Sequence, residues 1–238
     1  MKRSIRTALL AACTLLIGSP AIQAQDDGPA FQPLEMWACN FRDRKDQDDM
    51  DSVYEQLVDA TGDAAYASWQ LNPYFAGARV RDFDFLYLGA WSDGSAMGAD
   101  LESYMADATE IGEAWDETVE CGAMMFASNT IQDVPASDGE GSGTFMLTVS
   151  DCKIAHGRTA AQAIGAISRY NDYRVANGSV VPTFAWFPVY GDGSAEFDFK
   201  LAQAYSGPQA MGDQFSWIVD NQSYNVENAL TQGLVDCD

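Results

Sequence analysis

The chain has 238 residues, of which 13 are basic and 35 are acidic, so its formal net charge at pH 7 is −22. A protein this acidic repels nucleic acids and anionic membranes, which excludes partners that are bound through positive charge. The chain has one histidine, no Cys-x-x-Cys pair and no D-x-[DN]-x-[DN]-G loop, so it lacks the usual zinc and calcium motifs. We therefore expect no metal and no cofactor.

The first 24 residues have the three parts of a secretory signal peptide. Lys2, Arg3 and Arg6 give a basic start, an apolar stretch follows, and Ala21–Ala24 provides the small residues of a cleavage site. Cleavage after Ala24 removes three bases and no acid, which changes the formal charge from −22 to −25. No later apolar run reaches the roughly 18 residues of a membrane span. We expect a periplasmic or secreted protein, and a lipoprotein processed at Cys13 is the alternative.

Residues 33–131 are expected to form a first unit with the order strand, helix, strand, strand, helix, strand. The strands are rich in apolar and aromatic residues, and the helices carry apolar residues at helical spacing. These elements are expected, in chain order, at residues 34–41, 46–61, 65–71, 82–91, 96–118 and 120–128. This βαββαβ order is the ferredoxin-like motif, and it predicts an α+β fold.

The second half of the chain repeats this pattern. FDFLYLGAWSDGSAMG at 83–98 aligns without a gap with FDFKLAQAYSGPQAMG at 197–212, and TVEC, which ends at Cys121, matches LVDC, which ends at Cys237. Residues 144–238 are therefore expected to form a second ferredoxin-like unit, joined to the first by a Gly- and Ser-rich linker at 132–143. Its helices are expected near 159–174 and 209–228.

The second unit ends one residue after Cys237, where the first unit continues into its fourth strand. The fourth strand of the second unit is therefore expected to be missing, which leaves its first strand with an unpaired edge. We favour a fragment of a longer chain as the explanation, and a naturally three-stranded second sheet is the alternative.

Four cysteines remain after signal cleavage, and their positions test this order of elements. In a βαββαβ unit the end of the first strand lies beside the start of the fourth, where cross-strand neighbours are about 4.5–5.5 Å apart. Cys39 and Cys121 occupy these two places in the first unit, and Cys152 and Cys237 occupy them in the second. We predict the disulfides 39–121 and 152–237, each worth about 4 kcal/mol on a chain-entropy estimate. Crossed pairing and free thiols are the alternatives.

Two fused units of this kind resemble the dimeric α/β-barrel superfamily, which includes the antibiotic-biosynthesis monooxygenase-like and stress-responsive A/B-barrel proteins. The resemblance rests on the order of elements and the repeat over residues 33–238, and no catalytic motif of the superfamily is matched. It implies a pseudo-dimeric barrel of two sheets packed face to face, with helices outside and a ligand cavity between the sheets. Some members are oxygenases without a cofactor, some handle haem, and some have no known activity.

Strand alternation suggests which side chains face the space between the two sheets. In the first strand of each unit, the more apolar alternate residues, such as Leu34 and Leu147, are assigned to the helix side. The residues then expected to line the space between the sheets are Glu35, Trp37, Asp84, Thr148, Ser150, Asp198 and Lys200.

Asp84 and Asp198 are the most specific candidates, because they occupy the same place in both units. If a pseudo-twofold axis brings the two carboxylates together, their pKa values split and one can act as an acid or a base. The alternative is that each aspartate makes local contacts, for example Asp198 with Lys200.

His156, at the entrance to a predicted helix, is a candidate base or ligand, and the alternative is an ordinary loop residue. Trp69 and Trp186 are candidates for the border of a cavity, and the alternative is the core. The favoured function is binding of a small apolar or aromatic ligand between the sheets by a monomeric exported protein. The alternatives are a structural or partner-binding protein with a filled barrel, and a cofactor-independent monooxygenase-like, isomerase or lyase enzyme.

Overall fold

The computed structural model describes residues 31–61, 66–75, 82–107, 109–133, 145–191 and 196–238. The predicted signal peptide lies outside these residues, and so does most of the predicted linker. None of the helices in the described part of the chain is long and apolar enough to cross a membrane.

Unit one, defined here as the described residues between Phe31 and Asp133, is a four-stranded antiparallel sheet with three helices. Its elements are β1 (Phe31–Phe41), α1 (Gln47–Thr61), β2 (Tyr66–Leu71), β3 (Phe85–Trp91), α2 (Gly94–Asp107), α3 (Thr109–Thr118) and β4 (Val119–Gln132). The strand order β2-β3-β1-β4 is that of a ferredoxin-like unit. This part of the fold follows the sequence-based prediction.

Unit two, defined here as the described residues from Phe145 to Asp238, repeats this arrangement. Its elements are β5 (Met146–Ile154), α4 (Ala160–Ala176), β6 (Thr183–Tyr190), β7 (Phe199–Tyr205), α5 (Pro208–Asp220), α6 (Ser223–Thr231) and β8 (Val235–Cys237). The strand order β6-β7-β5-β8 is again ferredoxin-like. The fourth strand is represented by the three residues of β8, which pair with β5.

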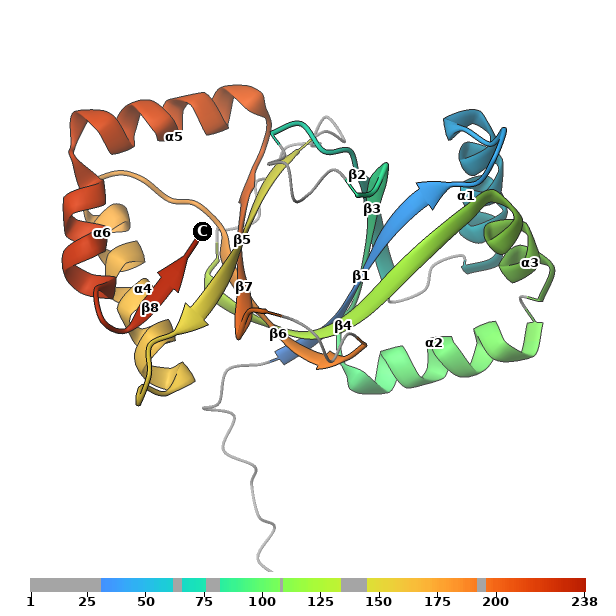
Figure 1. Cartoon of the computed structure of the whole chain (residues 1–238), viewed down its shortest axis with the longest axis horizontal. Helices are drawn as coiled ribbons and strands as arrows, with labels where there is room; N and C mark the ends of the chain where they lie inside the picture. The colour runs from blue at the N-terminus through green and yellow to red at the C-terminus, as the bar shows by residue number, and fades with distance from the viewer. Residues whose placement is uncertain (1–30, 62–65, 76–81, 108, 134–144, 192–195) are drawn as a thin grey trace, which may run out of the picture.

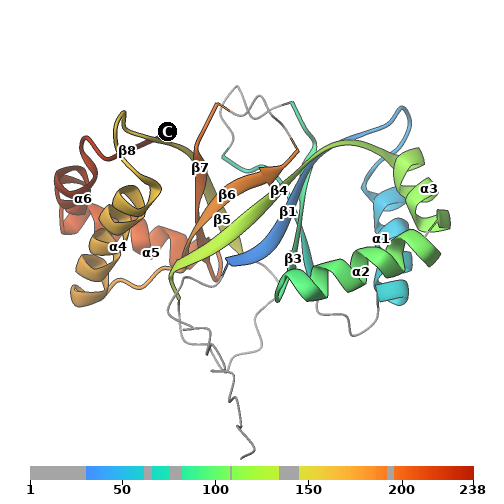
Figure 2. The same cartoon turned by 90° about the horizontal axis from the view of Figure 1, so that it is seen from below.

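The two sheets are joined edge to edge, because β4 of unit one pairs with β6 of unit two. The result is one eight-stranded sheet with the order β2-β3-β1-β4-β6-β7-β5-β8, not a closed barrel. Figures 1 and 2 show this curved sheet in the middle of the molecule, with α1, α2 and α3 at one end and α4, α5 and α6 at the other. In the described chain β8 pairs only with β5, so no ladder closes the sheet between β8 and β2.

The long second helix predicted for each unit is divided into two. In unit two the division falls at Gln222, whose φ of 47° lies in the left-handed region and ends the helical path. Unit one has the same arrangement, with α2 and α3 on either side of residue 108. The apolar stripe in the sequence continues across the break, which is why periodicity alone predicted a single helix.

Both predicted disulfides are present, Cys39–Cys121 and Cys152–Cys237. In each pair the two cysteines are directly opposite in the register of neighbouring antiparallel strands, and their Cα atoms are 4.1 Å apart. Cys39 and Cys152 are fully buried beneath the helices of their units. The disulfides therefore tie the first and fourth strands together at the helix-covered face of each sheet.

Candidate functional site

The face predicted for Glu35, Trp37, Thr148 and Ser150 is wrong, because these side chains lie on the helix side of the sheet. Alternate residues of a strand share a face, and Cys39 and Cys152 belong to the two helix-side cores. Trp37 accordingly packs edge-to-face against Trp115 of α3, with ring centroids 6.0 Å apart.

The physical reason for the error is that both faces of the sheet are apolar. Leu34 and Met36 of β1 belong to a third core cluster on the opposite face, together with Phe126, Trp186 and Ala202. We call this third cluster the inner cluster, because it combines residues from both units on the face away from the helices. The more apolar face of a strand is therefore not necessarily the face that the helices cover.

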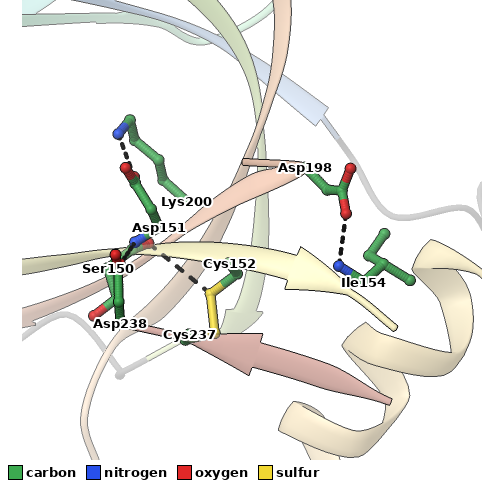
Figure 3. Close-up of a disulfide and its surroundings, with 8 residues drawn as sticks. All are labelled: Ser150, Asp151, Cys152, Ile154, Asp198, Lys200, Cys237 and Asp238. Carbon is green, nitrogen blue, oxygen red and sulfur yellow. Dashed lines mark hydrogen bonds and ion pairs between the residues drawn. A yellow bond between two sulfur atoms is a disulfide. The ribbon is translucent and has the colours of Figure 1, made fainter. Parts of the chain in front are cut away.

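Lys200 lies on the inner face, beside residues of the inner cluster. Its Nζ is 2.5 Å from Oδ1 of Asp151 on β5 (Figure 3). The same Nζ is 4.1 Å from the centroid of the Phe197 ring. Its carboxylate partner is thus Asp151 and not Asp198.

Asp84 and Asp198 make equivalent local contacts in their two units and are exposed. Asp84 Oδ2 accepts a hydrogen bond from the backbone N–H of Phe41 at 2.8 Å, and Asp198 Oδ2 accepts one from Ile154 at 2.6 Å (Figure 3). The backbone N–H groups of the two aspartates donate to the carbonyls of Cys39 and Cys152, each at 2.8 Å. The repeated Phe-Asp-Phe motif therefore fastens the start of the third strand to the end of the first.

The remaining predicted candidates are Trp186, Trp69 and His156. Trp186 is buried in the inner cluster, and Trp69 is 38% exposed, with its ring edge-on to Phe145 of unit two. The strand registers match Trp186 with Leu71, not with Trp69, because Leu71 pairs with Leu86 as Trp186 pairs with Lys200. His156 is exposed in the turn before α4.

A cavity of about 740 Å³ lies on the helix side of unit two. Its walls come from α4, α6, the turn after α6, and strands β7 and β8. The lining residues are Ala155, Ile167, Tyr170, Asn171, Leu201, Gln203, Glu227, Asn228, Thr231, Gln232, Gly233, Val235, Asp236 and Cys237. A concave site of this size, part apolar and part polar, is typical of small-molecule binding.

Comparison of the two units explains why this space is open. In unit one it is filled by four aromatic rings, those of Trp37, Tyr54, Tyr87 and Trp115, whose neighbouring centroids are 5.2 to 6.4 Å apart. Counting from the matched cysteines and phenylalanines gives the equivalent residues of unit two as Ser150, Ile167, Leu201 and Thr231. Each ring is replaced by a smaller side chain. Three of the four replacements, Ile167, Leu201 and Thr231, line the cavity.

Polar groups are buried in the wall of this cavity. Tyr170 lies within hydrogen-bond distance of Ser223, with the two hydroxyl oxygens 3.1 Å apart. Arg174 is only 3% exposed, its Nη1 donates to Oδ1 of Asn171 at 3.3 Å, and its Cζ is 5.6 Å from the centroid of the Tyr170 ring. Among the described residues no group accepts a hydrogen bond from Nε or Nη2 of Arg174 or from Nδ2 of Asn171.

Burial shifts the ionisation of these groups. It raises the pKa of the Glu227 carboxyl, and the positive charge of Arg174 and a hydrogen bond from Tyr170 oppose this increase. Burial also raises the pKa of the Tyr170 phenol and lowers the pKa of the Arg174 guanidinium. A carboxyl with a raised pKa in a cavity is a candidate for proton transfer.

Unit one has a buried polar cluster of its own, around Glu35. Oη of Tyr66 donates to Oε1 of Glu35 at 2.6 Å and lies 2.7 Å from Oη of Tyr87. Burial raises the pKa of Glu35, against the hydrogen bond from Tyr66. Gly89 leaves room for the Tyr66 ring, since a Cβ at this position would be 2.2 Å from Tyr66 Oη. The described residues contain no group of three or more His, Cys, Asp and Glu side chains suited to a metal ion.

The cavity residues were not predicted from the sequence, although the sequence holds two signals for them. Arg174 continues the buried stripe of α4 that includes Ala163, Ile167 and Tyr170, so a charged residue stands on an apolar helix face. The alignment of the repeats also places Thr231 where unit one has Trp115. A large-to-small replacement between two halves of one fold predicts either a cavity or a compensating side chain.

Comparisons with known proteins support the fold. No protein-family model and no curated protein matches the sequence. A proposed monooxygenase from Fusobacterium nucleatum subsp. nucleatum has a similar structure, with a TM-score of 0.57 and 10% identity over 87% of this chain and 88% of the other. A proposed monooxygenase from Lactobacillus acidophilus has a TM-score of 0.56 and 10% identity, over 87% of this chain and 91% of the other. A proposed chlorite dismutase has a TM-score of 0.50 and 7% identity, over 87% of this chain and 90% of the other.

These similarities cover most of the chain at very low identity, so they define the fold and not the activity. The chain has a tandem ferredoxin-like fold, as the order of its elements predicted.

Proposed function

We propose that this protein binds a small organic ligand in the cavity of unit two, between α4, α6 and the sheet. The observation that carries this proposal is the replacement of four aromatic residues of unit one, which pack against one another, by smaller ones around a space of about 740 Å³. A merely structural duplicate would gain stability by keeping this space filled, because empty apolar space costs packing energy. This site lies between sheet and helices and not, as the sequence predicted, between two sheets.

The lining residues support a ligand with both apolar and polar parts. Ile167, Leu201 and Val235 offer an apolar surface, while Asn171 and Glu227 offer polar groups in the same cavity. Mixed linings of this kind hold the body of a ligand by burial and fix its orientation by a few hydrogen bonds.

Thr231→Trp tests this proposal, because it restores the side chain that fills the equivalent space in unit one. The probe is N-phenyl-1-naphthylamine, an uncharged compound that fluoresces in apolar sites, added to the full chain with both disulfides formed. We expect saturable binding to the unchanged protein and loss of binding to the variant. Val219→Trp, which adds the same ring at a position that is 52% exposed on α5, is the control and should bind normally. Equal binding by Thr231→Trp would show that the probe does not enter this cavity.

A second candidate function is an enzyme that transfers a proton at Glu227. It is favoured by the raised pKa of this carboxyl in a cavity and by the fold similarity to proposed monooxygenases. The backbone hydrogen bonds of Asp84 and Asp198 and the exposure of His156 give no support to an acid–base role for those residues. Oxygen consumption with a panel of polyphenols should reveal such an activity, and Glu227→Gln should lower it about a hundredfold. A rate that is the same in this variant would exclude Glu227 as the base.

We also propose that the protein acts outside the cytoplasm as a monomer. Two disulfides fit an oxidising compartment, and the two units already provide within one chain the pair of domains that a dimer would supply.

A further inference from the structure

The polar wall of the cavity has more hydrogen-bond donors than acceptors. The acceptor of Asn171, its Oδ1, is already used by Nη1 of Arg174, which leaves the Nδ2 group of Asn171 free to donate. Nε and Nη2 of Arg174 also lack an acceptor among the described residues. Buried donors without acceptors are rare and costly, so a missing acceptor is expected at this place.

The charge of this wall indicates the kind of acceptor. Arg174 is buried, with only 3% of its surface exposed. Its guanidinium stays protonated, as arginine does in proteins. The ion pairs among the described residues involve Arg42, Lys45 and Lys200. No carboxylate of the described chain therefore lies within 4.0 Å of the Arg174 guanidinium. Glu227 interacts with Arg174 at longer range, and burial raises the pKa of Glu227, which weakens it as a counter-charge. A buried cation without a close partner is stabilised strongly by an anion.

The arrangement of the side chains places the anion at the α4 side of the cavity. Tyr170 and Asn171 line the cavity, and Arg174 lies behind both of them, against the Tyr170 ring and the Asn171 amide. Asn171 is therefore the residue that would touch the anion, and Arg174 would orient Asn171 and supply positive potential.

We propose that the ligand of this cavity is a small organic acid, whose anionic group accepts a hydrogen bond from Asn171 and is balanced by Arg174. Its apolar body then lies against Ile167, Leu201 and Val235. This inference rests on the proposed ligand-binding function and adds the chemical class of the ligand.

Two fluorescent probes that differ by one charged group provide the test. 1-Anilinonaphthalene-8-sulfonate carries a sulfonate that N-phenyl-1-naphthylamine lacks, and the two are otherwise the same molecule. On the full chain with both disulfides formed, we expect the sulfonate to bind about tenfold or more tightly than the neutral probe. Fluorescence that remains with Thr231→Trp reports binding elsewhere on the surface and is subtracted.

The preference for the anionic probe should disappear in Arg174→Met, while the neutral probe still binds. Arg169→Met removes the same charge from the exposed side of the same helix, and it should keep the preference. Asn171→Asp is the second test, because its carboxylate can still accept the hydrogen bond from Arg174 and so preserves the fold, yet repels an anion. Arg174→Lys keeps the charge and should keep part of the preference.

Equal affinities for the two probes in the unchanged protein would overturn this inference and leave ligand binding in place. A preference that persists in both Arg174→Met and Asn171→Asp would overturn it as well. If neither probe binds, the proposed ligand-binding function itself is wrong.

Discussion

Unit one and unit two have the same strand order, the same disulfide and the same Phe-Asp-Phe contacts, but they differ in how the space between helices and sheet is filled. In unit one, Trp115 touches the rings of Trp37, Tyr54 and Tyr87. In unit two, Thr231 occupies the matching place and lines a cavity of about 740 Å³. Residues that hold the backbone together are thus shared by both units, while residues that only fill space have diverged.

This difference shows that, after a duplication, one copy can keep a well-packed interior while the other loses packing. A unit with a filled interior can maintain the shared sheet, which leaves the other unit free to carry an open interior with buried polar groups. The joint between the units supports this division, because β4 pairs with β1 over Val119–Asn129 and with β6 over Met125–Gln132.

Removal of a disulfide should have the largest effect on stability, and its effect on probe binding should differ between the two units. Cys39→Ala/Cys121→Ala and Cys152→Ala/Cys237→Ala open loops with sequence separations of 82 and 85, so each should lower the free energy of unfolding by about 4 kcal/mol. Only the second change should also abolish probe binding, because β8 lines the cavity and is held by three paired residues. Urea unfolding followed by tryptophan fluorescence, and titration with N-phenyl-1-naphthylamine, measure the two effects.

In unit one, by contrast, eleven register pairs hold β4 to β1 after the disulfide is removed. Loss of probe binding in both double variants would show that the two units unfold together and that this part of the comparison fails.

Trp115→Thr should have the next largest effect, since it gives unit one the residue of unit two. Removing a ring that packs against three others should cost about 3 kcal/mol of unfolding free energy. The reverse change, Thr231→Trp, enters existing space and should cost far less. Thermal unfolding of the two variants side by side gives the comparison, and equal losses would argue that the cavity of unit two is already closed in solution.

Glu35→Gln should have the smallest effect, and one that depends on pH. Burial raises the pKa of Glu35 above its unfolded value, so ionisation of this group in the folded protein destabilises the fold as pH rises through the folded-state pKa. The glutamine keeps an acceptor for Tyr66 but does not ionise. The variant should therefore gain stability relative to the unchanged protein on going from pH 4 to pH 7, by about 1.4 kcal/mol for each unit of pKa elevation.

Glu55→Gln makes the same change of charge at an exposed position of α1 and serves as the control. Unfolding midpoints in urea across this pH range provide the measurement. If Glu35→Gln and the control give parallel curves, ionisation of Glu35 has no part in the stability of unit one.

The sequence by itself determined the features that depend on local pattern and on the repeat. The order of elements in each unit follows from periodicity and turn residues, and the pairing of Cys39 with Cys121 follows from the positions of strand ends in a βαββαβ unit. The local contacts of Asp84 and Asp198 were foreseen as an alternative, because an aspartate at a strand start readily accepts a backbone hydrogen bond. These features need only neighbouring residues or elements within one unit.

The tertiary structure alone decided which face of each strand the helices cover, how the two units join and where the cavity lies. Alternation divides Leu34 and Glu35 between two faces but does not name the faces, and here both faces are buried against apolar side chains. The β4–β6 joint depends on the edges that two units present to each other, which no local pattern encodes. The cavity depends on volumes contributed by α4, α6, β7 and β8 together, so it became visible only when these elements were packed.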